Sequence, residues 1–283
     1  MPELPEVETI ARGLAKQVAG DVIESVWLGS KPEPLKSPAA DIVNTLEHAR
    51  IKDVRRVGKH IVIDLSGGSR VANRKRKHDS GPGNAEAQWI VHLGMTGQLL
   101  IANPGQDVPK HTHAVLRLRS GKELRFVDPR RFGRLAVLQH AFQAPGSEPL
   151  DVGFELFSGL FRKRKTPIKS ALLNQKLLSG IGNIYADEAL FRAGVRPRRR
   201  AASLTRAELQ RLYHAVQKVL NEAIAAGGSS ISDYVDANGD AGFFQFQHRV
   251  YGREGRPCLV CRTPIKRIII AGRSAHYCSK CQN

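Results

Sequence analysis

The first residues of the chain are of types that could do chemistry together. Pro2 follows Met1, and Glu3 follows Pro2. Proline is small enough for Met1 to be removed, which would leave a secondary amine at the terminus with Glu3 beside it. A free α-amine titrates near pH 8, far below a lysine, so a useful fraction is unprotonated at neutral pH. Such an amine can attack an electrophilic carbon and leave an iminium. The alternative is that Pro2 only starts a helix whose positive end is stabilised by Glu3 and Glu6.

The cysteines form the strongest general motif. They fall in the last 26 residues as two Cys-x-x-Cys pairs that sixteen residues separate: Cys258 with Cys261, and Cys278 with Cys281. This spacing indicates a structural zinc site with four protein ligands, which leaves no open position for a substrate. Two disulfides are the alternative. The intervening segments Ile265–Ile270 and Ala275–Tyr277 suit a two-stranded hairpin, with Arg273 at its tip.

Lysine 59 is a third group with possible chemistry. Lys59 follows Arg55-Arg56-Val57-Gly58 where a strand is expected to begin. It could be a catalytic amine, a phosphate contact or a surface charge. Taken alone, its surroundings favour the surface charge.

Two glycine-containing turns carry exposed side-chain types. Met95 lies in His92–Gly97, and glycine-flanked turns lie at surfaces, where a methionine packs poorly. The turn Asp128–Gly133 places Arg130 and Arg131 beside Phe132. Arginines on phosphates next to an apolar wedge are a recurring means of bending DNA. The alternative is a solvated arginine pair with Phe132 turned inward.

Other candidate contacts are less specific. His111 and His113 flank the start of a strand, and a plain polar surface role explains them equally well. The basic run Arg162–Lys165 precedes a helix. Gly180-Ile181-Gly182 makes a tight turn, and Asn183 starts the next helix. Backbone N–H groups at a helix start bind phosphate, and the asparagine can add a hydrogen bond.

The elements expected from periodicity and turn residues predict an α+β chain. A helix over Glu3–Val18 precedes short strands, and the chain beyond a linker at Ala144–Pro149 is mostly helical. The loop Ser229–Gly255 is polar and glycine-rich and could order over a ligand. The expected strands are Val22–Leu28, Ile51–Val54, His60–Leu65, Trp89–Leu93, Gln98–Ile101, Ala114–Arg119, Glu123–Val127 and Arg134–Leu138. The expected helices beyond the first are Ala39–Leu46, Ile168–Asn174, the one that starts at Asn183, and Thr205–Ala226.

The bulk properties narrow the class of protein. The chain has 283 residues, enough for two domains, and 44 Lys and Arg against 26 Asp and Glu give a net charge of +18. Such an excess suits a polyanion, with nucleic acid as the first candidate. No apolar stretch is long enough to span a membrane. The segment Ser66–Gln88 interrupts the β pattern and is expected to be a basic loop. It could attract DNA electrostatically, or it could be a solvated insertion.

These motifs, in this order, resemble the formamidopyrimidine-DNA glycosylase family of bacterial DNA repair enzymes. The resemblance covers essentially the whole chain. It rests most on the first eight residues and on the Gly180–Ala186 turn, and Leu4 favours the purine branch over a sister group that removes oxidised pyrimidines. The basic segment 66–88 is longer than the family leads us to expect. The motifs that carry the resemblance are Pro2–Glu8, Gly58–His60, His92–Gly97, Asp128–Gly133, Gln175–Phe191 and the cysteine hairpin with Arg273.

The resemblance implies a role for each candidate residue. Pro2 would attack C1′ of the damaged nucleotide, Glu3 would be the general acid–base partner, and Glu6 would support them. Lys59 would assist strand cleavage by β-elimination, and Arg273 would assist the δ-elimination. The implied DNA contacts are His111, Arg130, Lys165 and Asn183, and the residues that would fill the gap left by the extruded nucleotide are Met95, Arg130 and Phe132.

The implied fold is an N-terminal β-sandwich with flanking helices, then a helix–two-turn–helix domain ending in a zinc-finger β-hairpin. The expected boundaries are 1–140, a linker at 141–152, 153–255 with a loop over the extruded base, and 256–283. We expect a monomer in the bacterial cytoplasm, one structural zinc ion, and DNA with oxidised bases or abasic sites as partner. The alternatives are the pyrimidine-specific activity and a non-catalytic zinc-containing DNA-binding protein.

Overall fold

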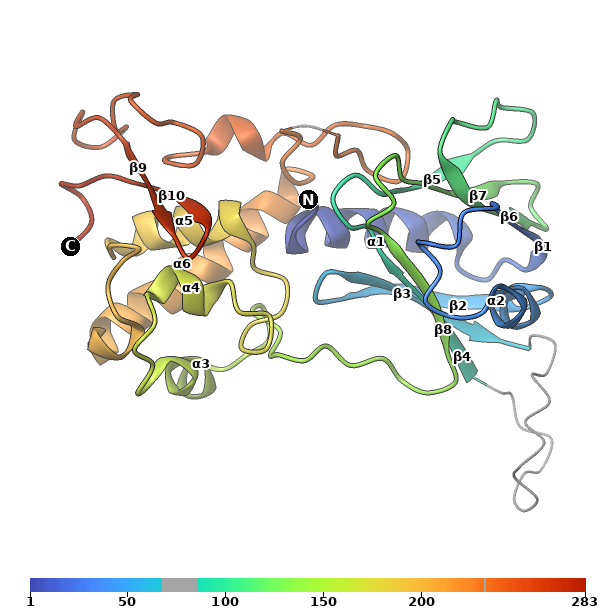
Figure 1. The fold of residues 1–283 in the computed structure, drawn as a ribbon, viewed down its shortest axis with the longest axis horizontal. Helices are drawn as coiled ribbons and strands as arrows, with labels where there is room; N and C mark the ends of the chain where they lie inside the picture. Colours follow the sequence, from blue (N-terminus) through green and yellow to red (C-terminus); the bar gives the residue numbers. More distant parts are fainter. Residues whose placement is uncertain (68–85, 232) are drawn as a thin grey trace, which may run out of the picture. The chain divides into compact units, whose positions relative to one another are not determined.

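The computed structural model describes residues 1–67, 86–231 and 233–283 (Figure 1). The chain forms two compact units that interleave along the sequence. The first unit holds residues 1–2, 6–143 and 230–242, and the second holds 3–5, 144–229 and 243–283. The domain boundaries expected from the sequence stay a prediction.

The first unit is built on two antiparallel four-stranded sheets. One has the order β1–β6–β7–β5, and the other has the order β2–β3–β4–β8. The strands of the first sheet are β1 (Ile23–Leu28), β5 (Gln98–Ala102), β6 (Thr112–Leu118) and β7 (Glu123–Val127). Those of the second are β2 (Arg50–Val57), β3 (His60–Ser66), β4 (Glu86–His92) and β8 (Arg134–Leu138).

Both sheets and the first helix contribute to one hydrophobic core. Helix α1 (Leu4–Val18) buries Ile10 and Leu14 at the helical spacing that the sequence predicts. The core also contains Trp89 from β4 and Phe126 from β7. Helix α2 (Ala39–Leu46) adds its buried face to the same core. The β-sandwich with flanking helices is therefore confirmed.

Strands β3 and β4 pair further than the apolar pattern indicates. Their ladder runs from His60↔His92 to Ser66↔Glu86. Backbone hydrogen bonds continue the ladder into polar sequence, because they need no apolar side chain. The segment 66–88 is therefore strand at both ends, and its basic residues at 70–77 lie outside the described residues.

The second unit is helical and ends in a hairpin. Its core packs Phe157 and Phe161 against Tyr185, Leu212 and neighbouring side chains. The elements are α3 (Phe154–Phe161), α4 (Ile168–Leu172), α5 (Asn183–Ala193), α6 (Arg206–Ala225), two 3₁₀ turns (Ala201–Ser203 and Phe244–Gln247), and the strands β9 (Lys266–Ile270) and β10 (Arg273–Tyr277). The helical domain with its terminal hairpin agrees with the predicted class.

The glycine-rich loop expected over 229–255 divides between the two units. Residues 230–242 belong to the first unit, where the Tyr234 hydroxyl donates to the carbonyl of Glu6 at 3.4 Å. The amide of Ile101 donates to the carbonyl of Ala237 at 2.9 Å. Residues 243–255 belong to the second unit and lead into the hairpin.

In the parts of the chain that the structure describes, no helix has the length and apolar character needed to cross a membrane.

Helix α6 begins with a complete capping box, and this generates a pH-dependent prediction. Thr205 Oγ1 accepts from the amide of Glu208 at 3.2 Å, and the Glu208 carboxylate accepts from the amide of Thr205 at 2.8 Å. The hydrogen bond from Arg199 and those from Thr205 hold the pKa of Glu208 at about 2. Because this folded pKa is depressed, the stabilisation is present above the usual pKa of glutamate and is lost as pH falls toward 2.

We therefore expect Glu208→Gln to lower the unfolding free energy at pH 6, with the difference from wild type shrinking as pH falls from 5 to 2. Urea unfolding at a series of pH values measures this. Thr205→Ala, which removes the cap hydroxyl but keeps the Glu208 carboxylate and its bond from Arg199, should cost about 1 kcal/mol at pH 6 and should retain part of the pH dependence. A Glu208 effect that is constant from pH 5 to pH 2 would contradict the assignment.

Candidate functional site

The carboxylate of Glu3 lies at the start of helix α5. Its Oε1 accepts a hydrogen bond from the amide of Ile184 at 3.2 Å, and the amide of Leu4 donates to the carbonyl of Gly180 at 3.1 Å. The first amides of a helix are unpaired and carry a partial positive charge, which stabilises a carboxylate there. Glu3 is only 4% exposed. Its charged end is therefore fixed by the backbone of the 180–184 turn.

The two glycines of this turn are required by space. A Cβ on Gly182 would lie 2.1 Å from Cδ of Glu3, and Gly180 has φ +106° with Leu4 packed against it. Gln175 holds the turn from the other side, because its Nε2 donates to the carbonyl of Ile181 at 2.8 Å. The Gly180-Ile181-Gly182 motif therefore forms the backbone turn against which the Glu3 side chain packs.

Pro2 and Lys59 belong to the first unit. Pro2 is buried just before α1, and Lys59 lies in the turn between β2 and β3 with 9% exposure. Arg56 ties this turn to α1, since its Nε donates to Glu8 at 2.7 Å and its Nη1 to the carbonyl of Gly58 at 3.1 Å. The surface-charge interpretation of Lys59 is wrong, because the turn folds it into the protein.

A buried carboxylate also organises the two exposed turns of the first unit. Asp128 Oδ1 accepts from Thr96 Oγ1 at 2.6 Å and from the amide of Arg130 at 3.2 Å. Its Oδ2 accepts from the amide of Gly133 at 2.7 Å. A Cβ on Gly94, which has φ +63°, would lie 2.5 Å from the backbone carbon of Phe132. The turns 94–97 and 128–133 are therefore packed backbone to backbone.

The side chains at the tips of these turns point to solvent. Met95 is 40% exposed and Phe132 is 52% exposed. The guanidinium of Arg130 lies 4.9 Å from the centre of the Phe132 ring. The structure thus brings Met95, Arg130 and Phe132 together, and Phe132 is not turned inward.

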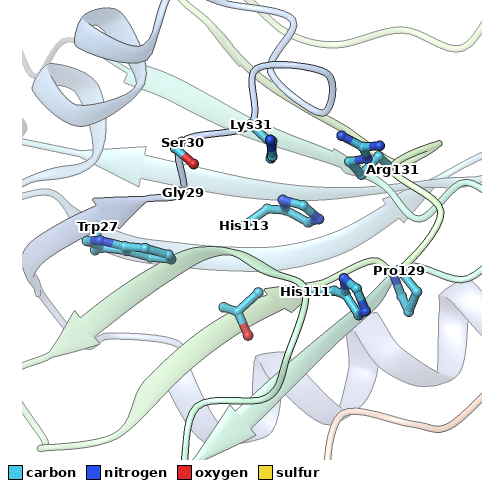
Figure 2. A pocket seen from close by; sticks show the side chains of 9 residues that line it. Trp27, Gly29, Ser30, Lys31, His111, His113, Pro129 and Arg131 are labelled. Carbon is cyan, nitrogen blue, oxygen red and sulfur yellow. The ribbon is translucent and has the colours of Figure 1, made fainter.

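The two histidines at the start of β6 have different places. His113 is buried, and its Nε2 lies 2.9 Å from the carbonyl oxygen of Asp128. His111 is exposed and lines a pocket of about 440 Å³ (Figure 2). Sequence reasoning missed this pocket, which also contains Trp27 from β1 and the cations Lys31 and Arg131.

Sequence reasoning also missed a buried polar cluster in the second unit. Lys169 Nζ donates to Asp187 Oδ1 at 2.6 Å, and Asp187 Oδ2 accepts from the amide of His276 at 2.9 Å. Lys169 also donates to the carbonyl of Ser274. Burial lowers the pKa of Lys169, and the charge of Asp187 opposes that shift. The cluster joins α4, α5 and β10.

The remaining predicted contacts of the second unit have the following places. Asn183 Nδ2 donates to Ser274 Oγ at 3.3 Å, at the start of α5. Arg273 is exposed at the first position of β10, paired with Ile270. Lys165 is exposed in the run before α4. Asn183 and Arg273 therefore meet the same strand, and Lys165 stays a separate surface cation.

The four cysteines are free thiols whose sulfur atoms all lie within 4.8 Å of one another. Tetrahedral zinc with Zn–S bonds of about 2.3 Å places its sulfurs about 3.8 Å apart, so the cluster fits the ion. The amides of Val260 and Cys281 donate to the sulfurs of Cys258 and Cys278, as expected around thiolate ligands. Gln282 braces the cluster by accepting from the amide of Cys278 at 2.8 Å. The disulfide alternative is wrong, and the site is a structural zinc site.

Three family models together match nearly the whole chain. The formamidopyrimidine-DNA glycosylase N-terminal domain matches residues 1–135, and the H2TH domain of the same glycosylase matches 145–235. A zinc finger found in that glycosylase and in isoleucyl-tRNA synthetase matches 255–283. The pattern accounts for both units and the hairpin.

Individual relatives agree with these models. A formamidopyrimidine-DNA glycosylase of Solibacter usitatus is 44% identical, over 100% of this chain and 99% of its own length. The crystal structure of the Thermus thermophilus protein has a TM-score of 0.83 at 39% identity and covers 99% of this chain and 98% of its own. A glycine-to-proline variant of the Lactococcus lactis protein, solved with DNA containing Fapy-dG, has a TM-score of 0.85 at 29% identity with full coverage of both chains.

The zinc site generates a prediction about folding. We expect one zinc ion per chain, and Cys278→Ala should lose the metal and unfold residues 256–283, because metal binding is coupled to folding in such small sites. Metal analysis and amide hydrogen exchange measure the two effects. Ser279→Ala, at a neighbouring position without a ligand atom, is the matched control and should keep its zinc. A chain purified without chelator that contains no zinc would refute the assignment.

Proposed function

Because the chain belongs to the formamidopyrimidine-DNA glycosylase family, we propose that it excises oxidised purines from duplex DNA and then cleaves the strand. The proposed substrates are 8-oxoguanine and formamidopyrimidines, and the second activity is that of an abasic-site lyase. The net charge of +18 supports a DNA partner. The Lactococcus lactis relative, which was solved with DNA containing Fapy-dG, supports the class of lesion.

The proposed first step uses Pro2. Its nitrogen, freed by removal of Met1, attacks C1′ of the damaged nucleotide, and the glycosidic bond breaks as the new C–N bond forms. The departing base leaves with the bonding electron pair and is protonated. Opening of the sugar ring then gives a cationic iminium between Pro2 and C1′. Glu3 moves the protons of this step as general acid and base, supported by Glu6.

The proposed later steps cleave the strand. Loss of a proton from C2′ of the iminium expels the 3′ phosphate, with Lys59 assisting this β-elimination. A second, δ, elimination expels the 5′ phosphate with the help of Arg273. Hydrolysis of the remaining iminium frees Pro2.

The DNA must be distorted for C1′ to be reached. A base stacked in a duplex blocks the attack, so the nucleotide is extruded at an energetic cost of a few kcal/mol. Met95, Arg130 and Phe132 occupy the vacated space, and the exposure of Met95 and Phe132 supports this role. The proposed DNA contacts are His111, Arg130, Lys165 and Asn183, and the loop Ser229–Gly255 covers the extruded base.

The observation that carries the proposal is the position of the Glu3 carboxylate at the 180–184 turn. A carboxylate next to the proposed nucleophile in the sequence is buried and held by the amide of Ile184, at a glycine that leaves no room for a methyl group. A helix-capping role for Glu3 on its own helix α1 does not require that arrangement. A non-catalytic DNA-binding protein would not need it either.

The test of the nucleophile uses borohydride, which reduces an iminium to a stable protein–DNA adduct. We expect an adduct on an 8-oxoguanine duplex, with peptide mapping placing the link on Pro2. Retaining Met1 turns the Pro2 nitrogen into an amide and should abolish both adduct and excision while DNA binding survives.

Lys59→Ala is the matched control and should still form the adduct, because the proposed nucleophile is the Pro2 nitrogen, which this substitution leaves in place. An adduct on Lys59, or native excision by the Met1-retaining chain, would contradict the mechanism. Parallel duplexes with an oxidised pyrimidine or an abasic site report the range of substrates.

A second test concerns the glycine under Glu3. Gly182→Ala places a methyl group where Cδ of Glu3 lies, so the carboxylate must move. We expect excision to fall at least 100-fold, the scale that positioned acid–base groups contribute, with zinc content and DNA affinity little changed. Gly159→Ala is the control, because nothing lies within 4 Å of its added Cβ. Equal excision by both variants would remove Glu3 from the reaction.

A further inference from the structure

The pocket beside the 128–133 turn has an aromatic platform that the proposed reaction does not use. The indole of Trp27 is 52% exposed on β1. Figure 2 shows it at one end of the pocket, with Lys31 and His113 in the middle of the view and Arg131, His111 and Pro129 toward the other end. An exposed indole near several cations is the combination that single-stranded nucleic acids recognise.

The turn 128–133, which carries the proposed wedge residue Phe132, also lines this pocket. Arg130 and Phe132 stack on each other, whereas Pro129 and Arg131 line the pocket. Alternate residues of one short turn therefore serve two surfaces. A strand that meets Phe132 can place a neighbouring nucleotide in the pocket.

Two of the lining residues hold a strained backbone conformation. His111 has φ 68° and Arg131 has φ 58°, which is the left-handed region that non-glycine residues seldom adopt. Such strain costs free energy and persists where surrounding structure imposes it, commonly at binding sites. Here the carbonyl of His111 accepts from the amide of Asp128 at 3.0 Å, which fixes the two segments together.

The cations of the pocket can accept a phosphate. Arg131 Nη1 pairs with Glu33 at 2.6 Å, but both side chains are about half exposed, and such surface pairs are weak. A phosphate offers several oxygens to an arginine and binds it more strongly. His113 is already bonded to the Asp128 carbonyl and serves as a wall. The phosphate ligands are therefore Lys31, His111 and Arg131.

We propose that this pocket binds one unpaired nucleotide of the DNA, with its base stacked on Trp27 and its phosphate held by Lys31, His111 and Arg131. The proposal rests on the proposed function only in taking DNA as the partner. A base within a duplex is stacked on both faces, so only an unpaired base can cover the indole. The volume of about 440 Å³ suits one small ligand.

The chain has two tryptophans, which makes the test direct. Trp89 is fully buried in the core, so a change in tryptophan emission on ligand binding reports Trp27. The probes are an eight-nucleotide oligothymidylate and an abasic oligomer of the same length made of tetrahydrofuran units. The tetrahydrofuran oligomer keeps the phosphates, lacks the bases, and has no C1′ hydroxyl through which the proposed lyase could form an iminium. We expect the thymidylate to quench Trp27 and to bind about tenfold more tightly than the abasic oligomer, the scale of one stacked base.

Variants separate stacking from charge. These variants lack the Trp27 emission, so their affinities are measured by the fluorescence anisotropy of end-labelled oligomers. Trp27→Ala should lose the preference for thymidylate, and Trp27→Phe should restore most of it. Lys31→Ala should weaken both oligomers and reduce the salt slope by about 0.7, as expected for one phosphate contact to a single strand. Lys16→Ala, an exposed lysine of α1 outside the pocket, is the control and should leave the preference for thymidylate unchanged.

Two results would overturn the proposal. One is equal binding of the two oligomers by wild type, and the other is an unchanged thymidylate preference in Trp27→Ala. Excision of 8-oxoguanine from a duplex is measured on the same wild-type sample. This measurement distinguishes a failure of the pocket proposal from a failure of the proposed function. Excision without base-dependent quenching refutes the pocket alone, and quenching without excision refutes the proposed reaction alone.

Discussion

The second unit depends on one buried carboxylate, that of Asp187. Each of its oxygens is hydrogen-bonded, Oδ1 to Lys169 and Oδ2 to the amide and ring of His276. Lys169 and Asp187 are almost fully removed from water. Removing one partner of such a pair strands the other charge and costs about 3–5 kcal/mol. Helices α4 and α5 and strand β10 are therefore stable only in this mutual arrangement, which fixes the base of the strand that begins with Arg273.

The same helix α5 carries two further polar anchors of the unit. Its first turn holds Glu3 through the amide of Ile184. Glu188, one residue after Asp187, accepts from the amides of residues 249–251 at 2.9–3.1 Å and so fixes the segment that leads to the zinc hairpin. Burial raises the pKa of Glu188, and these backbone donors oppose the rise. Helix α5 thus sets the positions of the Glu3 carboxylate, of Asn183 and of the zinc hairpin.

Sequence reasoning succeeded where a local pattern has a local cause. The helical spacing of Ile10 and Leu14 predicts α1, and the cysteine spacing predicts the metal site. It failed where the cause is non-local. The partners Lys169 and Asp187 lie 18 positions apart, and Asp187 and His276 lie 89 apart, with nothing in either neighbourhood to pair them.

Two further features that the sequence does not predict also have non-local causes. His111 and His113 have the same residue type two positions apart, and the contacts that bury His113 come from Asp128 and Phe126, more than ten residues away. The sequence predicts no separate helix at α3, because eight residues with no side-chain cap at the start give a weak helix signal. Its identity comes from packing Phe157 and Phe161 against the other helices.

Exposed apolar side chains in the first unit have a cost that its buried anchors offset. Leaving a phenylalanine such as Phe132 in water forgoes roughly 1.5–3 kcal/mol of burial, and the neighbouring left-handed residues add strain. Asp128 opposes both, because its carboxylate binds the side chain of one turn and two amides of the other. Asp187 acts in the same way. Each of the two aspartates is a buried carboxylate with both oxygens hydrogen-bonded, and each fixes a backbone segment whose outermost side chains are exposed. A substitution at Asp128 should therefore act by displacing the exposed residues of the two turns, whose own chemistry stays intact, whereas one at Asp187 also leaves the buried charge of Lys169 without its partner.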